Sequence, residues 1–409
     1  MKRVVVTGAG GITALGGSWQ EIKQSLEQRR SAVRYMQEWE CYEGLQSRLL
    51  APLPEALPLG PEYTRKRTRS MGRVALLSTL AADRALEDAG LKGSGELKNG
   101  STGLACGSCM GSLQPIFDCA SLFTKHTTAD LTSSTYLQIM PHTTAVNTAL
   151  FFGIRGRIIT TSSACTSSSQ AIGFSYEGIR EGRQTIMVAG GAEELSVAYT
   201  AIFDTLFATS LKNDDPTHTP RPFDVKRDGL VLGEGGAALI LEEREHALAR
   251  GAKIYAEVVG YATNCDATHV TNPCSETMQI CMELALKDAG LSASAVGYVN
   301  GHGTATELGD IAESTATSRL YGDRLPFSTF KGNFGHTLGA CGALEAWLTI
   351  QMMNQEVFYP TLNLEEPDPR CGQLDYLIGA DRALSTEYVQ SNNFAFGGIN
   401  TSLIFKRAD

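Results

Sequence analysis

The sequence has no uninterrupted apolar run of about 18 residues, the length that a membrane-spanning helix needs. Its N-terminus, Met1–Val6, leads directly into a short apolar segment, and no secretory signal with a small-residue cleavage site follows. Charged residues make up only 19% of the chain, and the net charge of −9 lacks the basic surplus of nucleic-acid-binding proteins. We therefore expect a cytoplasmic protein without a membrane span and without a nucleic-acid partner.

Cysteine and histidine limit the kinds of site that the chain can hold. The ten cysteines follow no disulfide-framework spacing, which in a chain of 409 residues is typical of reduced thiols. Cys106 and Cys109 form a CxxC pair, but no second pair and no neighbouring histidine pair completes a zinc site, so we expect no metal. Only seven histidines occur, and four are expected on the surface or in loops: His126, His142, His218 and His246.

A nucleotide cofactor is also not expected. The segment Val4–Gly11 is predicted to be a strand that enters a glycine-rich turn, as in dinucleotide-binding proteins. That fingerprint needs a third glycine where Thr13 stands, and it needs an acidic residue at the end of a short following strand, which is missing. The segment therefore predicts a strand and a turn without nucleotide binding.

An internal repeat organises what the chain does contain. The residues Ala-Leu-Glu-Asp-Ala-Gly-Leu at 85–91 recur as Ala-Leu-Lys-Asp-Ala-Gly-Leu at 285–291, and each copy is typical of a helix that ends at a glycine. Each copy is followed by a strand that reaches a glycine-rich turn, Thr102–Gly107 and Val296–Gly303. Helices alternate with strands on both sides, so we expect a mixed sheet with helices on its faces in each half. The predicted halves are residues 1–248 and 249–409.

One strand-to-helix segment is expected to carry chemistry. Ile158–Thr161 is predicted to be a buried strand, small residues follow, and a helical pattern then runs to Ile179. Cys165 lies at the start of this helix, whose dipole is worth up to ~2 kcal/mol and is expected to bring a thiol pKa from ~8.5 to ~7. Such a thiol would be a nucleophile, and the alternative is a small core residue like the other nine cysteines.

Two of the remaining histidines lie in matching contexts. The run Phe327–Ala340, which contains His336, repeats the strand, turn and helix pattern of the Cys165 segment. A second glycine-rich turn, Val299–Thr306, contains His302. Because a two-fold pseudo-symmetry would bring these turns together, we expect one thiol and two imidazoles to converge.

These residues carry a resemblance to a known family. Its four signatures follow one another along the chain as Ser163–Ser167, Asn300–Asp310, Lys331–Ala340 and Asn393–Gly398. Further matches are Arg221–Asp224, Asp228 with Gly229, and Gly233–Gly235. The chain resembles, essentially from end to end, the elongating β-ketoacyl-carrier-protein synthases. The resemblance implies an α/β, thiolase-like fold in which two pseudo-symmetric halves form five layers, α-β-α-β-α.

The resemblance also implies a Cys-His-His reaction of the ping-pong type. No cofactor is needed, because the substrates are carried on the phosphopantetheine of an acyl carrier protein. Cys165 would take an acyl chain, and the backbone N–H groups of Cys165 and Phe396 would form the oxyanion hole. His302 and His336 would hold the malonyl thioester oxygen while carbon dioxide leaves. The enolate would then attack the acyl group on Cys165, which extends the chain by two carbons.

Further residues are assigned by the same resemblance. Lys331 is expected to hold His336 and its loop electrostatically, together with Glu345. The other assignments are the gating residues Phe396, Gly397 and Gly398, the pantetheine-binding residues Thr304 and Thr306, and the acyl-pocket residues Met110 and Phe203. Core packing is the alternative for the two acyl-pocket residues.

Two kinds of protein partner are expected. The chain is acidic overall, yet it holds a local basic cluster, which we expect to dock an acidic carrier protein; the alternative is a solvated face. The docking residues are Arg65, Lys66, Arg69 and Lys212. Because the thiolase fold buries the mouth of its active site against a second subunit, we also expect a homodimer, or a heterodimer with a homologous chain-length factor.

The gating turn departs from the family pattern, which usually reads Gly-Phe-Gly-Gly-Thr-Asn. Here Ala395 and Ile399 replace a glycine and the threonine. Alanine restricts the backbone freedom that a swinging Phe396 would need, so we expect gate opening and acyl preference to differ. The segment Asn264–His269 resembles the partner loop of this gate.

Several alternatives stay open. The chain is expected to be either a housekeeping fatty-acid synthase or a ketosynthase of a dedicated polyketide or aryl-polyene pathway, and the altered gate favours the second. A thiolase would need a second catalytic cysteine late in the chain, and Cys341 lies inside a predicted helix instead. Starter-type synthases use Cys-His-Asn, which His336 argues against. A silent chain-length factor would lack the nucleophile, whereas Cys165 is present.

Overall fold

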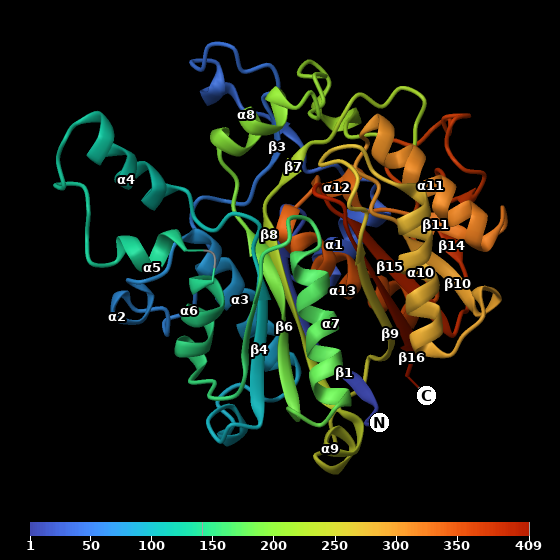
Figure 1. Ribbon diagram of the computed structural model, residues 1–409, viewed down its shortest axis with the longest axis horizontal. Coiled ribbons are helices and arrows are strands. Elements are labelled where there is room, and N and C mark those ends of the chain that lie inside the picture. The colour runs from blue at the N-terminus through green and yellow to red at the C-terminus, as the bar shows by residue number, and fades with distance from the viewer. Residues whose placement is uncertain (141, 409) are drawn as a thin grey trace.

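The computed structural model describes residues 1–140 and 142–408 (Figure 1). Its main feature is an eleven-stranded sheet of order β13-β11-β10-β15-β16-β9-β1-β8-β6-β4-β5. The strands of the first half are β1 (Val4–Thr13), β4 (Thr102–Gly107), β5 (Ile158–Thr161), β6 (Ile186–Glu193) and β8 (Gly235–Glu243). Those of the second half are β9 (Ala256–Cys265), β10 (Val296–Asn300), β11 (Pro326–Ser328), β13 (Asp375–Tyr376), β15 (Tyr388–Phe394) and β16 (Ile399–Arg407).

The strand order repeats, which confirms the predicted pseudo-symmetric α/β fold. The order β5-β4-β6-β8-β1 in the first half matches β11-β10-β15-β16-β9 in the second. In each half the first three strands are parallel and the next two pairings are antiparallel. The predicted boundary at residue 248 falls at the end of helix α9 (Arg244–Ala249), just before β9.

We expected a separate sheet in each half, but the pairing of β1 with β9 joins the two into one sheet. These strands pair antiparallel where Val4–Val6 faces Ala256–Val258. Val4 and Val6 on one face and Val5 on the other are almost completely buried, so both sides of β1 belong to the core. One continuous sheet therefore places the strand ends of both halves in a fixed relation to each other.

Helices complete the layers (Figure 1). Helices α7 (Ser167–Arg180) and α13 (Cys341–Gln355) contact strands of both halves and lie between them. On the outer faces, α3 (Arg73–Asp88) and α6 (Thr143–Phe152) cover the first half, and α10 (Ser275–Ala289) covers the second with α11 (Glu307–Tyr321) against it. The first-half strands, the two central helices and the second-half strands thus form the inner layers of an α-β-α-β-α arrangement.

The two central helices begin close together, which positions the site. A Cβ atom on Gly342 of α13 would lie only 2.0 Å from the Ser169 hydroxyl of α7, so the absence of a side chain permits this approach. Along its length α13 is almost entirely buried, with Leu344 and Leu348 in the largest apolar cluster. A helix that packs between two layers is mostly apolar around its circumference, and Glu345 is the charged exception in α13.

The glycine-rich N-terminal segment differs from its prediction. We expected a turn at Gly8–Gly11, but β1 continues as a strand to Thr13. A Cβ atom at Gly8 would lie 2.5 Å from the Ala85 carbonyl of α3, and one at Gly10 would meet the backbone of the same helix. These glycines therefore allow a helix to pack closely on a strand, and they form no phosphate-binding turn.

Smaller elements surround this framework. They are α1 (Trp19–Glu27), β2 (Arg34–Tyr35), β3 (Leu49–Ala51), α2 (Arg65–Thr68), α4 (Gln114–Thr124), α5 (Thr135–Ile139), α8 (Val197–Thr205), β7 (Leu232–Gly233), α12 (Lys331–Phe334), β12 (Val357–Phe358) and β14 (Arg382–Ala383). Helices α4 and α5 form an arm that projects from the body (Figure 1). No helix within the described residues is both long and apolar enough to cross a membrane.

Candidate active site

Cys165 lies in a tight turn between β5 and α7. Ala164, just before it, has a left-handed φ of 52°, a conformation that costs a non-glycine residue about 1–3 kcal/mol. Hydroxyl groups hold this turn: Ser163 N–H donates to Ser167 Oγ at 2.9 Å, and Thr166 Oγ1 donates to the Ser163 carbonyl at 2.7 Å. The thiol is thereby presented, buried, at the N-terminal end of α7.

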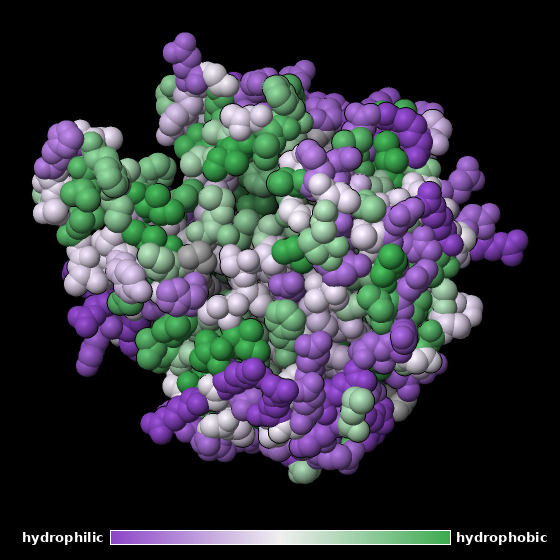
Figure 2. Space-filling view, in the orientation of Figure 1, coloured by the Kyte–Doolittle hydropathy of each residue, from purple (hydrophilic) through white to green (hydrophobic). Residues whose placement is uncertain are grey.

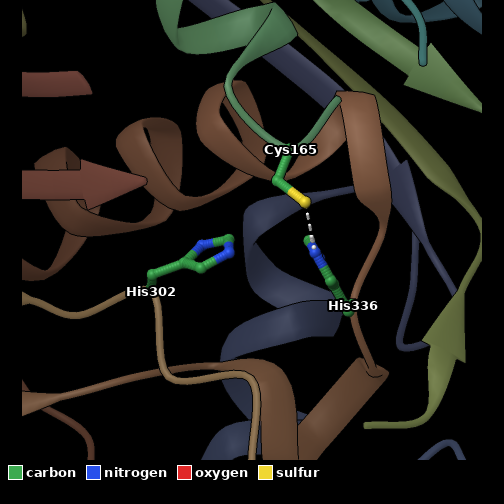
Figure 3. Close-up of side chains that lie close together, drawn as sticks. All are labelled: Cys165, His302 and His336. Carbon is green, nitrogen blue, oxygen red and sulfur yellow. Dashed lines mark hydrogen bonds between the residues drawn. The ribbon is translucent and has the colours of Figure 1, made fainter. Parts of the chain in front are cut away.

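The predicted convergence of the thiol and two imidazoles is confirmed. His336 Nε2 lies 2.9 Å from Cys165 Sγ. The rings of His302 and His336 stand nearly perpendicular, at 87°, with their centroids 5.0 Å apart (Figure 3). All three side chains are buried and line one cavity of about 310 Å³.

Hydrogen bonds to the segment Val231–Gly233 fix the backbone of His336. Its N–H donates to the Val231 carbonyl at 2.8 Å, and its carbonyl accepts from Gly233 N–H at 2.9 Å. Gly335, just before it, has a left-handed φ of 72°. The second-half turn that carries His336 is thus bound to a first-half segment next to β7.

His302 follows β10, and a carboxylate that the sequence did not reveal holds it. Glu313 on α11 accepts the backbone N–H groups of His302 and Gly303, at 2.5 and 2.7 Å. Burial raises the pKa of Glu313 to about 8, and those N–H groups oppose the rise. Asp310 and Glu313 are both buried in α11. Because they are three residues apart and lie on one helix face, their spacing could have indicated that Glu313 is buried near the site.

Lys331 contacts His302 rather than His336, which corrects the predicted arrangement. Its ammonium lies 3.3 Å from His302 Nδ1 and also donates to the His302 carbonyl. It forms a buried ion pair with Glu345, as expected. Toward His336 we find only the effect of its charge, which lowers the pKa of that ring.

Asn393 is a second residue to which the sequence assigned no role, although it lies in a signature segment. Its amide donates to Glu345 Oε2 at 2.6 Å and lies 3.3 Å from His302 Nδ1. The Lys331 ammonium and this amide are both donors, so Nδ1 must accept and the neutral ring carries its hydrogen on Nε2. His302 Nε2 has no partner among the described groups, so its N–H is available to a substrate.

Both imidazoles are uncharged at neutral pH. Burial, followed by the charge of Lys331, lowers the pKa of His302 and of His336 well below 6.5. Burial also works against the Lys331 ammonium, but the Glu345 carboxylate outweighs it and the pKa of Lys331 is raised. The site therefore combines one permanent ion pair with two neutral rings.

The expected lowering of the Cys165 pKa is wrong. Burial raises the pKa of this thiol to about 12, although Lys331 and the backbone N–H groups of Phe396 and Cys165 act in the opposite direction. Removal from water destabilises the thiolate by more than the helix N-terminus and the Lys331 ammonium stabilise it. Cys165 is therefore a neutral thiol, and its proton must be taken up during attack by the nearest acceptor, His336 Nε2.

The gating turn lies directly beside the sulfur. The Phe396 N–H faces Cys165 Sγ, as an oxyanion hole requires, and the left-handed φ angles fall on Gly397 (91°) and Gly398 (78°). Ala395 is not left-handed, so alanine is unstrained in this conformation, contrary to the restriction we expected. Ile399 packs against an apolar cluster that contains Cys165 and Ala395.

The segment Asn264–His269 lies against this turn. Asp266 N–H donates to the Gly398 carbonyl at 2.8 Å, and the Asn400 amide donates to Asp266 Oδ1 at 2.7 Å. Further along the same loop, the Val270 carbonyl accepts Gly397 N–H at 2.8 Å. Movement of the gating turn away from this loop would break these bonds.

The substrate-contact residues predicted by resemblance surround the cavity. Thr304, Thr306 and Phe203 line it, and the two threonine hydroxyls lie 2.9 Å apart. Met110 does not line it but packs with Phe203 and Phe396 in one apolar cluster. The rings of Phe203 and Phe396 have centroids 6.0 Å apart. These placements agree with an acyl channel and equally with core packing for Met110.

The predicted docking residues do not form one patch within a single chain. Arg65, Lys66 and Arg69 are exposed on or beside α2. Lys212 follows α8, and its ammonium donates to the Lys226 carbonyl at 2.7 Å. Figure 1 shows α2 and α8 in different parts of the molecule.

The cysteine and histidine clusters favour acid–base chemistry. Ligand-type atoms of Cys165, His302 and His336 lie within 4.8 Å of one another, as do those of His302, Cys341 and Glu345. A cation in either group would lie beside the buried Lys331 ammonium, which repels it. Neither group includes the CxxC pair, of which Cys106 contacts Ser78 instead, at 2.9 Å.

Comparison with known proteins agrees with this geometry. Residues 1–247 match the model of the beta-ketoacyl synthase N-terminal domain, and residues 255–365 match that of the C-terminal domain. The chain is 36% identical over 421 residues to 3-oxoacyl-[acyl-carrier-protein] synthase 2 of Synechocystis, covering 99% of this chain and 98% of that one.

Two solved structures are similar over their whole length. A beta-ketoacyl synthase from Burkholderia phymatum matches with a TM-score of 0.98 and 56% identity, covering 100% of both chains. The ishigamide ketosynthase/chain length factor matches with a TM-score of 0.90 and 29% identity, again over 100% of both chains.

Proposed function

Because the chain belongs to the β-ketoacyl synthase family and is an acyltransferase of the 3-oxoacyl-[acyl-carrier-protein] synthase type, we propose that its thiol and its two imidazoles divide the reaction. The observation that carries this proposal is the neutral Cys165 thiol 2.9 Å from a neutral His336, with the free Nε2–H of His302 beside them. Cys165 takes the acyl chain, and the histidines hold the malonyl group.

In the acylation step, Cys165 Sγ attacks the carbonyl carbon of an acyl thioester. His336 Nε2 accepts the thiol proton as the S–C bond forms, and it returns that proton to the leaving pantetheine sulfur as the old C–S bond breaks. The backbone N–H groups of Cys165 and Phe396 hold the oxyanion. Each such donor typically contributes ~10²–10³ in rate.

In the condensation step, the malonyl thioester oxygen accepts hydrogen bonds from His302 Nε2–H and from His336. The neutral His336 ring must first move its hydrogen from Nδ1 to Nε2, because Nε2 was the proton acceptor during acylation. The bond to the malonyl carboxylate breaks, carbon dioxide leaves, and its electron pair forms an enolate that these donors stabilise. The enolate carbon then attacks the acyl carbonyl on Cys165. The C–S bond breaks, the β-ketoacyl chain stays on the carrier, and the thiolate that leaves takes up one proton from water, which balances the carboxylate charge lost with carbon dioxide. Neutral imidazoles suit this step because they donate hydrogen bonds to the thioester oxygen without forming an ion pair with the malonyl carboxylate.

Lys331, Glu345 and Asn393 position His302 in this scheme. The ammonium and the amide face Nδ1, which forces the ring hydrogen onto Nε2, where the substrate binds. Glu345 neutralises Lys331 and accepts from Asn393, so the three groups stabilise one another. They act through His302 and need not touch substrate.

We also propose a dimer and an acyl carrier protein as partners. Strand β5 ends the sheet with an unpaired edge, and Ile158 on it is exposed. The arm of α4 and α5 exposes further apolar side chains: Ile116, Phe117, Phe123, Tyr136 and Leu137. A strand edge without a partner among the described residues and an exposed apolar arm each support pairing with a second subunit. That subunit is either a second copy or a homologous chain-length factor.

The pathway is the remaining choice. Fatty-acid elongation is the main proposal, and a dedicated polyketide or aryl-polyene pathway is the alternative that Ala395 and Ile399 favour. All ten cysteines are free, which supports a reducing, cytoplasmic compartment. Mass spectrometry of the acyl chains trapped on Cys165 in cells separates the pathways: saturated chains of graded length indicate the first, and conjugated or keto-rich chains the second. An unacylated Cys165 would contradict the proposed function.

A further inference from the structure

Glu193 is a buried carboxylate that takes no part in the mechanism above. It is the last residue of β6, and its side chain is fully buried. Its two oxygens accept four hydrogen bonds, all of them from uncharged groups. Because removal from water destabilises a carboxylate, these four donors are what allows the charge to stay inside the protein.

The donors come from two segments that are far apart in the sequence. Three belong to Ser108–Met110, which follows β4 and which we call the pocket segment. The fourth is the backbone N–H of Gly339, three residues after His336. The distances to Glu193 are 2.9 Å from Ser108 Oγ and 3.3 Å from Met110 N to Oε1, and 2.6 Å from Cys109 N and 3.1 Å from Gly339 N to Oε2. One carboxylate therefore joins the pocket segment to the turn that carries His336.

The two segments also touch directly at Gly339. A Cβ atom there would lie 2.6 Å from the Cys109 nitrogen and 2.7 Å from Glu193 Oε2, so the absence of a side chain permits this approach. The pocket segment is thus held by backbone packing as well as by the carboxylate.

The pocket segment carries Met110 toward the substrate cavity. Met110 packs in one apolar cluster with Phe203 and Phe396, which line the cavity, whereas Met110 itself does not. It therefore lies behind these two rings. Helix α8 supports the neighbouring backbone, because the Tyr199 hydroxyl donates to the Gly111 carbonyl at 2.9 Å. Figure 2 shows hydrophobic side chains gathered over α8 above a hollow in this face.

Resting on the proposed function, we propose that Glu193 is a positioning residue that sets the selectivity among acyl chains by holding the backbone of the pocket segment. It does not touch substrate and acts through Met110. An acyl chain longer than the cavity must press the two rings toward Met110, so a firmly held Met110 disfavours it. Through Gly339 the same carboxylate keeps this wall in place relative to the His336 turn.

The hydrogen-bond pattern makes Glu193→Gln a selective probe. Four donors require acceptors on both oxygens, and the amide replaces one oxygen with a donor. We expect the amide nitrogen at the Oε1 position, because the Ser108 hydroxyl can turn and accept, whereas Oε2 faces the backbone N–H groups of Cys109 and Gly339. The Met110 N–H then loses its acceptor, while the bond to the His336 turn remains.

Protonation of Glu193 should act in the same way. Burial raises the pKa of Glu193 to about 7, although its four donors oppose the rise. The titratable groups that face it are Cys106, Cys109 and Tyr199, and burial raises the pKa of each, so all three are neutral in this range. A proton on Oε1 donates to the Ser108 hydroxyl, as the amide would. The parent below pH 7 should therefore resemble Glu193→Gln.

The test measures acylation of Cys165 by octanoyl and acetyl thioesters of N-acetylcysteamine, and the ratio of the two rates cancels their shared chemistry. Above pH 7 we expect Glu193→Gln to raise the octanoyl-to-acetyl ratio about five- to thirty-fold, the effect of one buried hydrogen bond. Carbon dioxide release from malonyl carrier protein is expected to stay close to that of the parent. The ratio of the parent should rise as the pH falls through about 7, and that of Glu193→Gln should not.

Glu194→Gln is the matched control. Glu194 is also buried, and it accepts the Leu113 N–H at 2.8 Å, outside the pocket segment. Its ratio is expected to equal that of the parent.

An unchanged or lower ratio in Glu193→Gln would overturn the proposal. An equal rise in Glu194→Gln would also overturn it, because the effect would then be a general loosening. So would a parallel loss of carbon dioxide release, because the carboxylate would then support the whole site. If Glu193→Gln does not fold, the parent decides alone: a ratio that rises as the pH falls through 7 supports the proposal, and a constant ratio overturns it. A parent that neither thioester acylates would contradict the proposed function itself.

Discussion

The two halves of the chain use the same strand, turn and helix for opposite purposes. The turn after β5 is short and reaches α7 at Ser167, whereas the turn after β11 contains α12 and reaches α13 only at Cys341. Hydroxyl groups hold the first turn, which presents a neutral thiol. The second turn carries Lys331, whose buried charge faces Glu345, and His336. The two matching turns thus differ in length, and the longer one carries the charged groups.

The nucleophile and the groups that stabilise charge therefore need different surroundings. A neutral thiol fits a small, dry turn, because burial costs it little until it reacts. A buried ammonium needs a carboxylate and further donors, which take more chain to supply.

Removing the thiol should abolish condensation. In Cys165→Ala no acyl-enzyme can form, because the nucleophile is missing, and intact-mass measurement is expected to show no acyl adduct. Cys341→Ala is the matched control, because Cys341 begins the equivalent helix and its sulfur contacts the Cys165 carbonyl at 3.1 Å. An acylated Cys165→Ala protein would contradict the assignment.

Removing the His302 donor should slow decarboxylation instead. We expect His302→Ala to lower carbon dioxide release from malonyl carrier protein by ~10²–10³, the usual cost of one oxyanion donor. Acyl-enzyme formation is expected to continue, because His302 lies outside the contact between Cys165 and His336. Full decarboxylation in this variant would refute the role of the ring.

Breaking the buried ion pair should destabilise the fold more than any change in the first turn. Lys331→Ala leaves Glu345 buried and unpaired, which typically costs about 3–5 kcal/mol of the free energy of unfolding. The double variant Lys331→Met with Glu345→Leu is expected to recover much of this, because no lone charge remains. Denaturant unfolding measures both. Ser167→Ala, which removes the hydroxyl that accepts the Ser163 N–H, is the first-turn comparison at about 1 kcal/mol. Equal losses at both turns would contradict the comparison.

Substitutions in the gating turn should affect only the acylation step. Restoring Gly at 395 and Thr at 399 is expected to change acyl-transfer rates a few-fold and to broaden the range of chains accepted, because Ile399 packs against the Cys165 cluster. Since Ala395 is unstrained here, we expect Ile399→Thr alone to give most of the effect. Pre-steady-state acylation across a ladder of acyl carriers measures it. Identical rates and selectivity in the parent and the double variant would rule out a gating role for both positions.

The smallest expected effect concerns pH. Burial keeps His302 and His336 neutral, so decarboxylation should not decrease as the pH falls through 6.5. Stability behaves differently: the unfolded chain binds protons on these rings near pH 6.5 while the folded chain does not. The free energy of unfolding should therefore fall as the pH drops below about 6.5 and be fully recovered above it. Decarboxylation that is halved at pH 6.5 would mean that the rings titrate normally.

Much of this architecture was predictable from the sequence, because its signals are local. The repeat at residues 85 and 285 identified the two halves, and the spacing of small residues after a strand located Cys165. The glycines of β1 were misjudged because a glycine that admits a neighbouring helix looks the same in sequence as one that forms a turn. Only the packing of α3 distinguishes the two.

What could not be predicted depends on contacts between elements that are far apart in the sequence. The ammonium of Lys331 reaches His302, 29 residues away in sequence, because α12 folds back toward the end of β10. Glu313 and Asn393 complete the same network from two other elements. The pKa of Cys165 depends on burial by both halves, which outweighs the local helix N-terminus. Sequence patterns describe each element but not the space that they enclose.

The most direct test of the division of labour is to measure carbon dioxide release from malonyl carrier protein by Cys165→Ala. The account predicts that this variant, although unable to form an acyl-enzyme, still decarboxylates malonyl carrier protein, because His302 and His336 remain in place. The same assay on His302→Ala should show the reverse pattern. If Cys165→Ala loses decarboxylation together with acylation while remaining folded, decarboxylation depends on the thiol and the proposed division of the reaction is wrong.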